Sequence, residues 1–156
     1  MVVTALGSPG YSVAVTTTIL YTDGACLGNP GPGGWAWLEV GAGFDSGGEP
    51  STTNQRMELT AALRGIQAIK GDLTIRSDSQ YLVRCFNEGW WRRWRRNSFR
   101  NSKNEPVANR DLWEQLLTEV VDSGRKVEFV WVKGHSDDEM NARVDQLAQE
   151  AARSFR

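Results

Sequence analysis

Two hydrophobic periods divide this chain of 156 residues, and the first is the short period of strands. Residues 17–22 (TTILYT) are β-branched and aromatic and predict a strand that ends near Asp23. Residues 35–40 (WAWLEV) and 43–49 predict two more strands. The glycines and prolines of residues 24–34 predict a loop between the first two. Because no helical pattern separates these strands, we expect an antiparallel meander.

The second period is helical and begins at Asn54, after which apolar residues recur at helical spacing. Four helical patterns are predicted to alternate with two strands, helices over residues 54–70, 78–89, 109–122 and about 137–153 and strands over 73–77 and 127–132. A short extra helix is predicted in the Trp-rich segment after Gly89. Ser136 and Glu139 form a capping-box pattern that would start the last helix at once, and a start nearer Asp138 is the alternative. The strand over residues 127–132 is apolar enough to be buried. The predicted fold is α/β, a mixed five-stranded sheet flanked by helices.

Length and composition predict one domain with a sizeable core. Residues 1–16 have no basic start and an interrupted apolar pattern, so we expect a flexible tail rather than a signal peptide, followed by a single domain over residues 17–156. No run of about 18 apolar residues is present, which argues against a membrane span. The two cysteines, Cys26 and Cys85, favour a reducing compartment, and we expect a cytoplasmic protein.

Charge is distributed unevenly, although the formal net charge is only −1. Residues 84–110 contain eight Arg or Lys against Glu88 and Glu105, so one cationic segment lies on an otherwise acidic chain. Such a segment can be an ordinary solvated helix. It also suits a polyanionic partner.

Four acids lie where predicted elements meet the core. Asp23 ends the first strand, and Asp78 follows the strand over residues 73–77. If these strands are neighbours, both carboxylates emerge at the edge where open α/β sheets bind ligands. Glu58 and Asp145 lie at the margins of the buried faces of their helices. Each acid alone is most simply a cap or a solvated side chain, but four at core margins favour a common site.

Clustered carboxylates repel one another unless a cation compensates them. Oxygen ligands without clustered Cys or His select Mg²⁺ or Mn²⁺ rather than zinc. Two such ions roughly 4 Å apart can activate a water and stabilise the leaving oxygen of a phosphodiester. The four acids therefore indicate a metal-dependent nuclease.

The sequence also resembles the type 1 ribonucleases H of bacteria. The resemblance is carried, in order and spacing, by TDGACLGNPGPGG, TTNQRMELTAA, SDSQY, the Trp-rich basic segment leading to NRDLW, and VKGHSDDEMNARVDQLA. It covers about residues 18–153. It implies the ribonuclease H-like fold and cleavage of the RNA strand of RNA–DNA hybrids, leaving 5′-phosphate and 3′-hydroxyl ends.

The resemblance also implies roles for individual residues. The metal ligands of the family fall on Asp23, Glu58, Asp78 and Asp145, which would hold two Mg²⁺ ions, with Mn²⁺ as a substitute. His135, the only histidine, would assist proton transfer or product release, since a histidine beside an acidic site can carry protons near neutral pH. The glycine-poor sequence SDDEM after His135 departs from many members of the family and predicts a stiffer loop.

Substrate contacts are implied in the same way. Thr53 and Asn109 would hold a DNA phosphate, and Trp90 and Trp94 would line a channel for the DNA strand. Asn29, Asn54, Gln55 and Gln80 would contact the minor groove of the hybrid, and Cys26 would also contact the substrate. The phosphate backbone would be bound by Arg92, Arg93, Arg95 and Arg96. Turn and helix-cap chemistry is the plain alternative for Asn29 and Thr53.

We therefore expect a monomeric, Mg²⁺-dependent enzyme acting on RNA–DNA hybrids, with no membrane and no obligate protein partner. Two alternatives stay open. A DNA-cleaving or strand-transferring enzyme would share the acids but need not share TNQRMEL, the basic segment or the GH loop. A catalytically silent hybrid-binding module would be expected to lose at least one acid.

Overall fold

The computed structural model of the chain describes residues 2–3, 13–14, 17–134 and 137–156. Its centre is a five-stranded sheet in the order β5-β4-β3-β6-β7. The strands are β3 (Thr18–Cys26), β4 (Gly31–Glu39), β5 (Phe44–Thr52), β6 (Leu73–Ser77) and β7 (Val127–Trp131). Strands β3, β4 and β5 pair antiparallel, whereas β6 pairs parallel to both β3 and β7. The mixed sheet and its initial meander are confirmed.

The segment predicted to be a long Gly-Pro loop is mostly strand. The β3–β4 ladder continues to the pair Cys26 and Gly33, so only residues 27–30 connect the strands. The Leu27 N–H closes this turn by donating to Pro32 O at 2.7 Å. Asp23 consequently lies inside β3, opposite Ala36, and not at a strand end. The prediction was wrong because glycine in a strand, although it weakens the strand, also marks a close approach of another backbone. Gly24 lies against the helix Asn54–Ala68 and Gly34 against the helix Glu139–Arg153.

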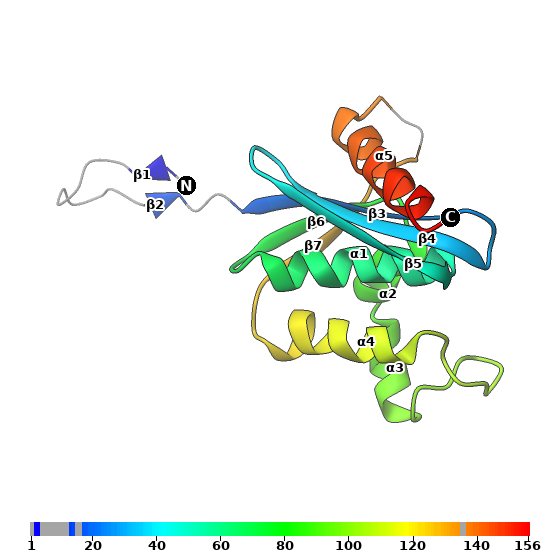
Figure 1. Cartoon of the computed structure of the whole chain (residues 1–156). Coiled ribbons are helices and arrows are strands. Elements are labelled where there is room, and N and C mark those ends of the chain that lie inside the picture. The colour runs from blue at the N-terminus through cyan, green and yellow to red at the C-terminus, as the bar shows by residue number, and fades with distance from the viewer. Residues whose placement is uncertain (1, 4–12, 15–16, 135–136) are drawn as a thin grey trace.

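The two faces of the sheet differ in side-chain size. Helix α5 (Glu139–Arg153) covers one face, while α1 (Asn54–Ala68) and the helices beyond it cover the other, as Figure 1 shows. On β4 the small residues Gly34 and Ala36 face α5, and a Cβ at Gly34 would collide with the backbone of Ala148 and Ala152. Large residues such as Leu20 and Trp37 face α1. The sequence of β4 therefore alternates small and large residues to suit two different layers.

Helix α1 confirms the prediction for residues 54–70 and lies close to the sheet because its contact face is small. Thr53 caps it by accepting a hydrogen bond from the Arg56 N–H at 3.2 Å. A Cβ at Gly65 would lie 3.1 Å from Leu20 Cδ1. At the other end, the Arg125 guanidinium donates hydrogen bonds of 2.6–2.9 Å to the carbonyls of Ile66, Ile69 and Gly71. Carbonyls at the end of α1 are thus satisfied by a residue distant in sequence.

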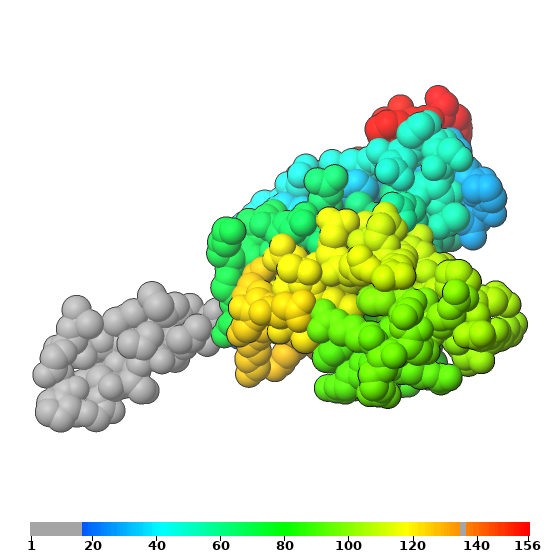
Figure 2. All heavy atoms as spheres, turned by 90° about the horizontal axis from the view of Figure 1, so that it is seen from below, coloured from blue at the N-terminus to red at the C-terminus, as the bar shows by residue number. Residues whose placement is uncertain are grey.

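The segment after β6 forms two helices, α2 (Gln80–Glu88) and α3 (Trp90–Arg96). Gly89 separates them with φ = 72°, a left-handed conformation that favours glycine. Helix α4 (Arg110–Leu117) continues as a π-helical segment, Thr118–Asp122, within the range predicted as one helix. Seen from below, the segment from α3 to α4 (green to yellow) covers much of this layer (Figure 2).

Strand β7 was predicted to be buried, and that prediction was wrong. It is an edge strand, and Val130 and Trp131 are exposed by 41% and 45%. The apolar run in the sequence does not distinguish an edge strand from a central one, because both pair their backbone and differ only in the neighbour on one side.

Helix α5 begins at Glu139 with Asp138 as its N-cap, which confirms the alternative start near Asp138 and not a start at Ser136. Ser136 itself lies outside the described residues. The Asp138 carboxylate accepts the N–H groups of Met140 at 3.0 Å and Asn141 at 3.2 Å. It therefore satisfies donors that the first turn of a helix leaves unpaired. The predicted apolar stripe is confirmed at Val144, Leu147 and Ala148, which are buried.

Two short strands precede the sheet, β1 (Val2–Val3) and β2 (Val13–Ala14), and they pair antiparallel. No strand was predicted in this segment. The division into a tail over residues 1–16 and a domain over 17–156 stays a prediction. Among the helices of the described residues, none has the length and apolar character needed to cross a membrane.

Candidate active site

The site is assembled on β3, where consecutive residues point to opposite faces of the sheet. Asp23 is 3% exposed and shares the α5 face with Tyr21 and Ala25. Its neighbour Gly24 points toward α1, where a Cβ would collide with the backbone of Met57 and Glu58. The missing side chain lets the first turn of α1 reach the strand, and this contact brings Glu58 next to Asp23. The Gly24 N–H also donates to Asp23 Oδ1 at 2.9 Å.

Three of the four predicted acids meet at this point. One carboxylate oxygen from each of Asp23, Glu58 and Asp78 lies within 4.8 Å of the other two. Asp78 comes directly after β6, which pairs with β3 in the register Thr22 to Ser77. An open cleft of about 380 Å³ surrounds the three carboxylates, and Asp145 of α5 lines it as well. The four acids therefore share one cleft, with Asp145 on its wall and outside the tight group of three.

The carboxylates of this cluster are electrostatically strained. Burial raises the pKa of Asp23 far above its usual range, and the nearby Glu58 and Asp78 carboxylates raise it further. Burial also raises the pKa of Glu58, with Asp78 acting in the same direction. Asp145 contributes to the raised pKa of Asp23. The cluster therefore binds protons, or another cation, more strongly than separate carboxylates would.

The residues fit a divalent cation. All three close ligands are carboxylates, the hard oxygen donors that Mg²⁺, Ca²⁺ and Mn²⁺ prefer. Glu58 Oε2 is buried and accepts no hydrogen bond from any residue in the described ranges. A buried oxygen of this kind normally has a partner. A cation between the carboxylates would supply this partner and offset their mutual repulsion.

Two polar residues of α5 line the cleft without having been predicted, Asn141 and Gln149. Asn141 is 4% exposed, and its Oδ1 has no hydrogen-bond partner within the described parts of the chain. It precedes Asp145 by four residues, so the two side chains lie on the same face of the helix. This spacing was the signal in the sequence that could have identified Asn141.

The loop that carries His135 approaches the cluster. A Cβ on Gly134 would lie 3.2 Å from Asp78 Oδ2, so the backbone just before the histidine lies against this carboxylate. His135 itself, and Ser136 after it, lie outside the described residues. The role of His135 and the stiffness of its loop stay predictions.

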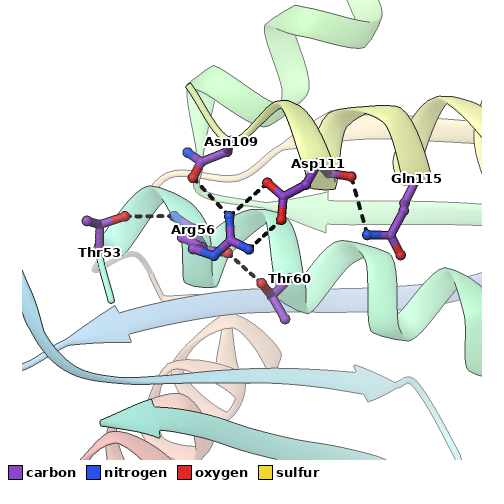
Figure 3. A network of polar contacts seen from close by, with 6 residues as sticks. All are labelled: Thr53, Arg56, Thr60, Asn109, Asp111 and Gln115. Carbon is purple, nitrogen blue, oxygen red and sulfur yellow. Dashed lines mark hydrogen bonds and ion pairs between the residues drawn. The ribbon is translucent and has the colours of Figure 1, made fainter. Parts of the chain in front are cut away.

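The two residues predicted to hold a phosphate, Thr53 and Asn109, lie on either side of Arg56 (Figure 3). The Arg56 guanidinium donates to Asn109 Oδ1 at 3.3 Å and forms an ion pair with Asp111 at 2.6 Å. Because Asn109 accepts through its oxygen, its NH₂ end faces away from Arg56, as the figure shows. Arg56 was not predicted as a site residue, and it joins the start of α1 to the start of α4.

The other predicted contacts lie around the cleft. Cys26 and Asn54 line it, and Cys26 Sγ donates to the carbonyls of Gly31 and Thr52 at 3.3 Å. Asn29 Oδ1 accepts the N–H of Asn54, the first residue of α1, at 3.1 Å, so Asn29 has the helix-cap role given as its alternative. Gln55 and Gln80 are exposed near the starts of α1 and α2.

The basic helix α3 combines packed aromatics with exposed cations. Trp94 is 8% exposed, with its ring centroid 5.2 Å from that of Trp113, and is part of the core. Trp90 is half-buried, and its indole N–H donates to Glu88 at 3.2 Å. Arg95 forms an ion pair with Asp122 at 2.9 Å. The other predicted cations, Arg92, Arg93 and Arg96, are exposed and form no ion pair with any described residue.

Comparison with known proteins identifies the family. The RNase H family model matches residues 15–153. Ribonuclease H of Moorella thermoacetica is 49% identical over 142 residues, which are 88% of this chain and 92% of that protein. Ribonuclease H of Chlorobium phaeovibrioides is 51% identical over 139 residues, which are 86% of this chain and 94% of that protein.

Solved structures agree with this assignment. The type 1 RNase H called LC9-RNase H1, which has the type 2 active-site motif, superposes with a TM-score of 0.74 and 28% identity, covering 92% of this chain and 76% of that chain. LC11-RNase H1, solved in complex with an RNA/DNA hybrid, gives a TM-score of 0.67 at 24% identity, covering 88% of this chain and 98% of that one. The fold, the acidic cleft and the sequence relatives lead to one conclusion: this chain belongs to the RNase H family.

Proposed function

We propose that this protein is an endoribonuclease that hydrolyses the RNA strand of RNA–DNA hybrids, with residues 17–156 as its catalytic domain. One observation carries the proposal. The carboxylate oxygens of Asp23, Glu58 and Asp78 lie within 4.8 Å of one another in an open cleft, in a chain of the RNase H family. Because both cysteines are free thiols, we also infer a cytoplasmic location.

Asp23, Glu58, Asp78 and Asp145 would hold two Mg²⁺ ions. Bound there, Mg²⁺ supplies activation of the attacking water and stabilisation of the leaving oxygen. The chain itself contributes the placement of these ligands. Gly24 admits Glu58 to the site, and the Asn141 amide offers a further oxygen toward the cleft. His135 is proposed to carry a proton during turnover.

The hybrid would lie across the cleft and be held on both sides. Arg92, Arg93 and Arg96 offer exposed cations to the DNA backbone, and the Asn109 NH₂ group and the Thr53 hydroxyl offer donors to one phosphate. Cys26, Asn29, Asn54, Gln55 and Gln80 are proposed to meet the minor groove. These contacts do not depend on the nucleotide sequence, which suits an enzyme that recognises the shape of the hybrid and its 2′-hydroxyl groups.

The substrate class is tested with three end-labelled substrates in Mg²⁺, an RNA–DNA hybrid, an RNA duplex and a DNA duplex. We expect cleavage of the RNA strand of the hybrid alone. Cleavage of the DNA duplex would favour a DNA-cleaving enzyme of the same superfamily. Binding of the hybrid without cleavage would favour a silent binding module.

The mechanism is tested by replacing Asp23 or Asp78 with Asn, which keeps the side-chain volume and removes the charge. We expect the turnover number to fall by more than about 100-fold, the upper end of the loss from a residue that only supports a metal ligand. Asp45→Asn is the matched control, because Asp45 is exposed on β5 and is not among the residues that line the cleft. Equal activity of Asp23→Asn and Asp45→Asn would exclude the proposed mechanism.

A further inference from the structure

A polar contact next to the acidic cleft joins the sheet to the start of α5. The Tyr21 hydroxyl donates to Asp138 Oδ2 at 2.7 Å and accepts from Arg76 Nη1 at 2.9 Å. The Arg76 guanidinium also lies over the Tyr21 ring, 5.6 Å from its centroid. Tyr21 is 3% exposed, so its hydroxyl needs these partners to be buried at low cost. Three segments distant in sequence therefore meet at one hydroxyl group.

Asp138 uses its two oxygens for two different purposes. Oδ1 accepts the N–H groups of Met140 and Asn141 and caps α5, while Oδ2 accepts the Tyr21 hydroxyl. Capping alone could be done by a serine, whose single oxygen satisfies the same donors. The second oxygen holds the capped helix against β3 through the Tyr21 hydroxyl.

The strand register places this contact beside the proposed metal ligands. Tyr21 pairs with Arg76 across β3 and β6. Tyr21 precedes Asp23 by two residues on β3, so both side chains are on the same face of the sheet. Arg76 precedes Asp78 by two residues, and Asp78 comes directly after the end of β6. On α5, Asp138 starts the helix whose next two turns carry Asn141 and Asp145 into the cleft. The contact thus joins the three elements that carry Asp23, Asp78 and Asp145.

We propose that Tyr21, Arg76 and Asp138 form a positioning clamp, which fixes the first turns of α5 relative to the carboxylates of β3 and β6 and thereby sets the affinity of the cleft for divalent cations. The proposal rests on the metal site proposed above. The clamp touches neither substrate nor metal and acts through the position of α5. Without it, Asp145 and Asn141 keep their helix but lose their fixed distance from Asp23.

Tyr21→Phe tests the clamp, because it removes the hydroxyl and keeps the ring. Mg²⁺ binding is measured by calorimetry without substrate, and activity is measured as a function of Mg²⁺ concentration. We expect the dissociation constant for Mg²⁺ and the half-activating Mg²⁺ concentration to rise about fivefold, the equivalent of one hydrogen bond. At saturating Mg²⁺ the turnover number should recover, and the KM for the hybrid should not change.

Asp138→Ser is the second variant, since it keeps a capping oxygen and removes the tether; the same rise in the Mg²⁺ dissociation constant is expected even if Tyr21→Phe folds poorly. Tyr81→Phe is the control, because Tyr81 packs on Trp113 and not on the cleft. Unchanged Mg²⁺ binding in a folded Tyr21→Phe or Asp138→Ser protein would overturn the clamp. Absence of Mg²⁺ binding to the unmodified protein would instead overturn the proposed metal site.

Discussion

The acidic cleft and the basic helix α3 contain the two most conspicuous sets of residues in the chain. They differ in whether their side chains have partners within the protein. In the cleft, Glu58 Oε2 and Asn141 Oδ1 are buried without hydrogen-bond partners in the described residues, and carboxylates crowd one another. In α3, the aromatic Trp94 is packed in the core, and Arg95 has an acidic partner.

This difference shows which features of a sequence point to chemistry. The cleft is locally unfavourable without a cation, so its residues cost stability and are explained by function. Much of the Trp-Arg pattern of α3 is explained by packing, because Trp94 anchors the helix and leaves the exposed arginines at the surface. An unusual composition is therefore a weaker sign of a site than unsatisfied buried groups.

The largest effect that sharpens this comparison is expected from Trp94→Ala. It should cost about 3–5 kcal/mol of unfolding free energy, because it empties a site against Trp113 and Phe99. Urea denaturation measures this loss. Trp90→Ala, at a half-buried position, should cost less stability and weaken hybrid binding more. A larger loss of unfolding free energy for Trp90→Ala than for Trp94→Ala would make Trp90 the core residue and assign the channel role to Trp94.

A smaller effect is expected from Mg²⁺ and pH acting on the cleft. Burial and charge repulsion raise the pKa of Asp23 and Glu58 in the folded state. The metal-free protein should therefore lose stability as the pH rises from about 4, the pKa of these carboxyl groups in the unfolded chain, through their raised pKa values in the folded state. In this pH range the folded state holds protons that the unfolded state has already released, so a further rise in pH destabilises it. At 100 times its dissociation constant, Mg²⁺ should restore about 2.7 kcal/mol.

Thermal denaturation with Mg²⁺ or with a chelator, at pH 5.5 and pH 8, measures this effect. The rise in Tm caused by Mg²⁺ should be larger at pH 8, where protons compete less for the carboxylates. Asp23→Asn is the control, since it removes one repelling charge and should reduce the pH dependence. An equal Mg²⁺ effect at both pH values would contradict a carboxylate site.

The smallest effect is expected at the surface of α3. Arg96→Ala should lower the slope of log binding constant against log salt by about 1 while changing the unfolding free energy by less than about 0.5 kcal/mol. Arg95→Ala is its matched partner and should change the salt slope less, because Arg95 is already paired with Asp122. Hybrid binding at several salt concentrations measures both. Equal slopes for Arg96→Ala and the unmodified protein would show that this surface of α3 does not contact the DNA backbone.

Much of the fold could be predicted because its hydrophobic periods are clear. The helix beginning at Asn54 and the strand over residues 73–77 were identified from periodicity alone. Strand extension into the Gly-Pro segment could not be predicted, because the helices that need small residues there come later in the chain. The edge position of β7 also depends on a neighbour that sequence spacing does not show.

The candidate site was predictable in its acids and not in their support. The spacing of Asp23 and Asp78 after apolar strands led to a shared sheet edge, and the structure brings them together with Glu58. Arg56 and Tyr21 were missed, since each depends on a contact between segments distant in sequence. Asn141 was missed although its spacing of four residues from Asp145 was visible in the sequence. Local sequence patterns indicate the chemistry that a side chain can perform, whereas tertiary contacts determine its position in the site.

Gly24 has a consequence for comparing members of this family. The approach of Glu58 to Asp23 depends on a position with no side chain, and no substitution of an acid is needed to disturb it. A relative that retained all four acids but had a bulkier residue at this position would be classified as active by a search for ligands and would lack an assembled metal centre. Inventories of active and inactive relatives should therefore score this glycine together with the acids.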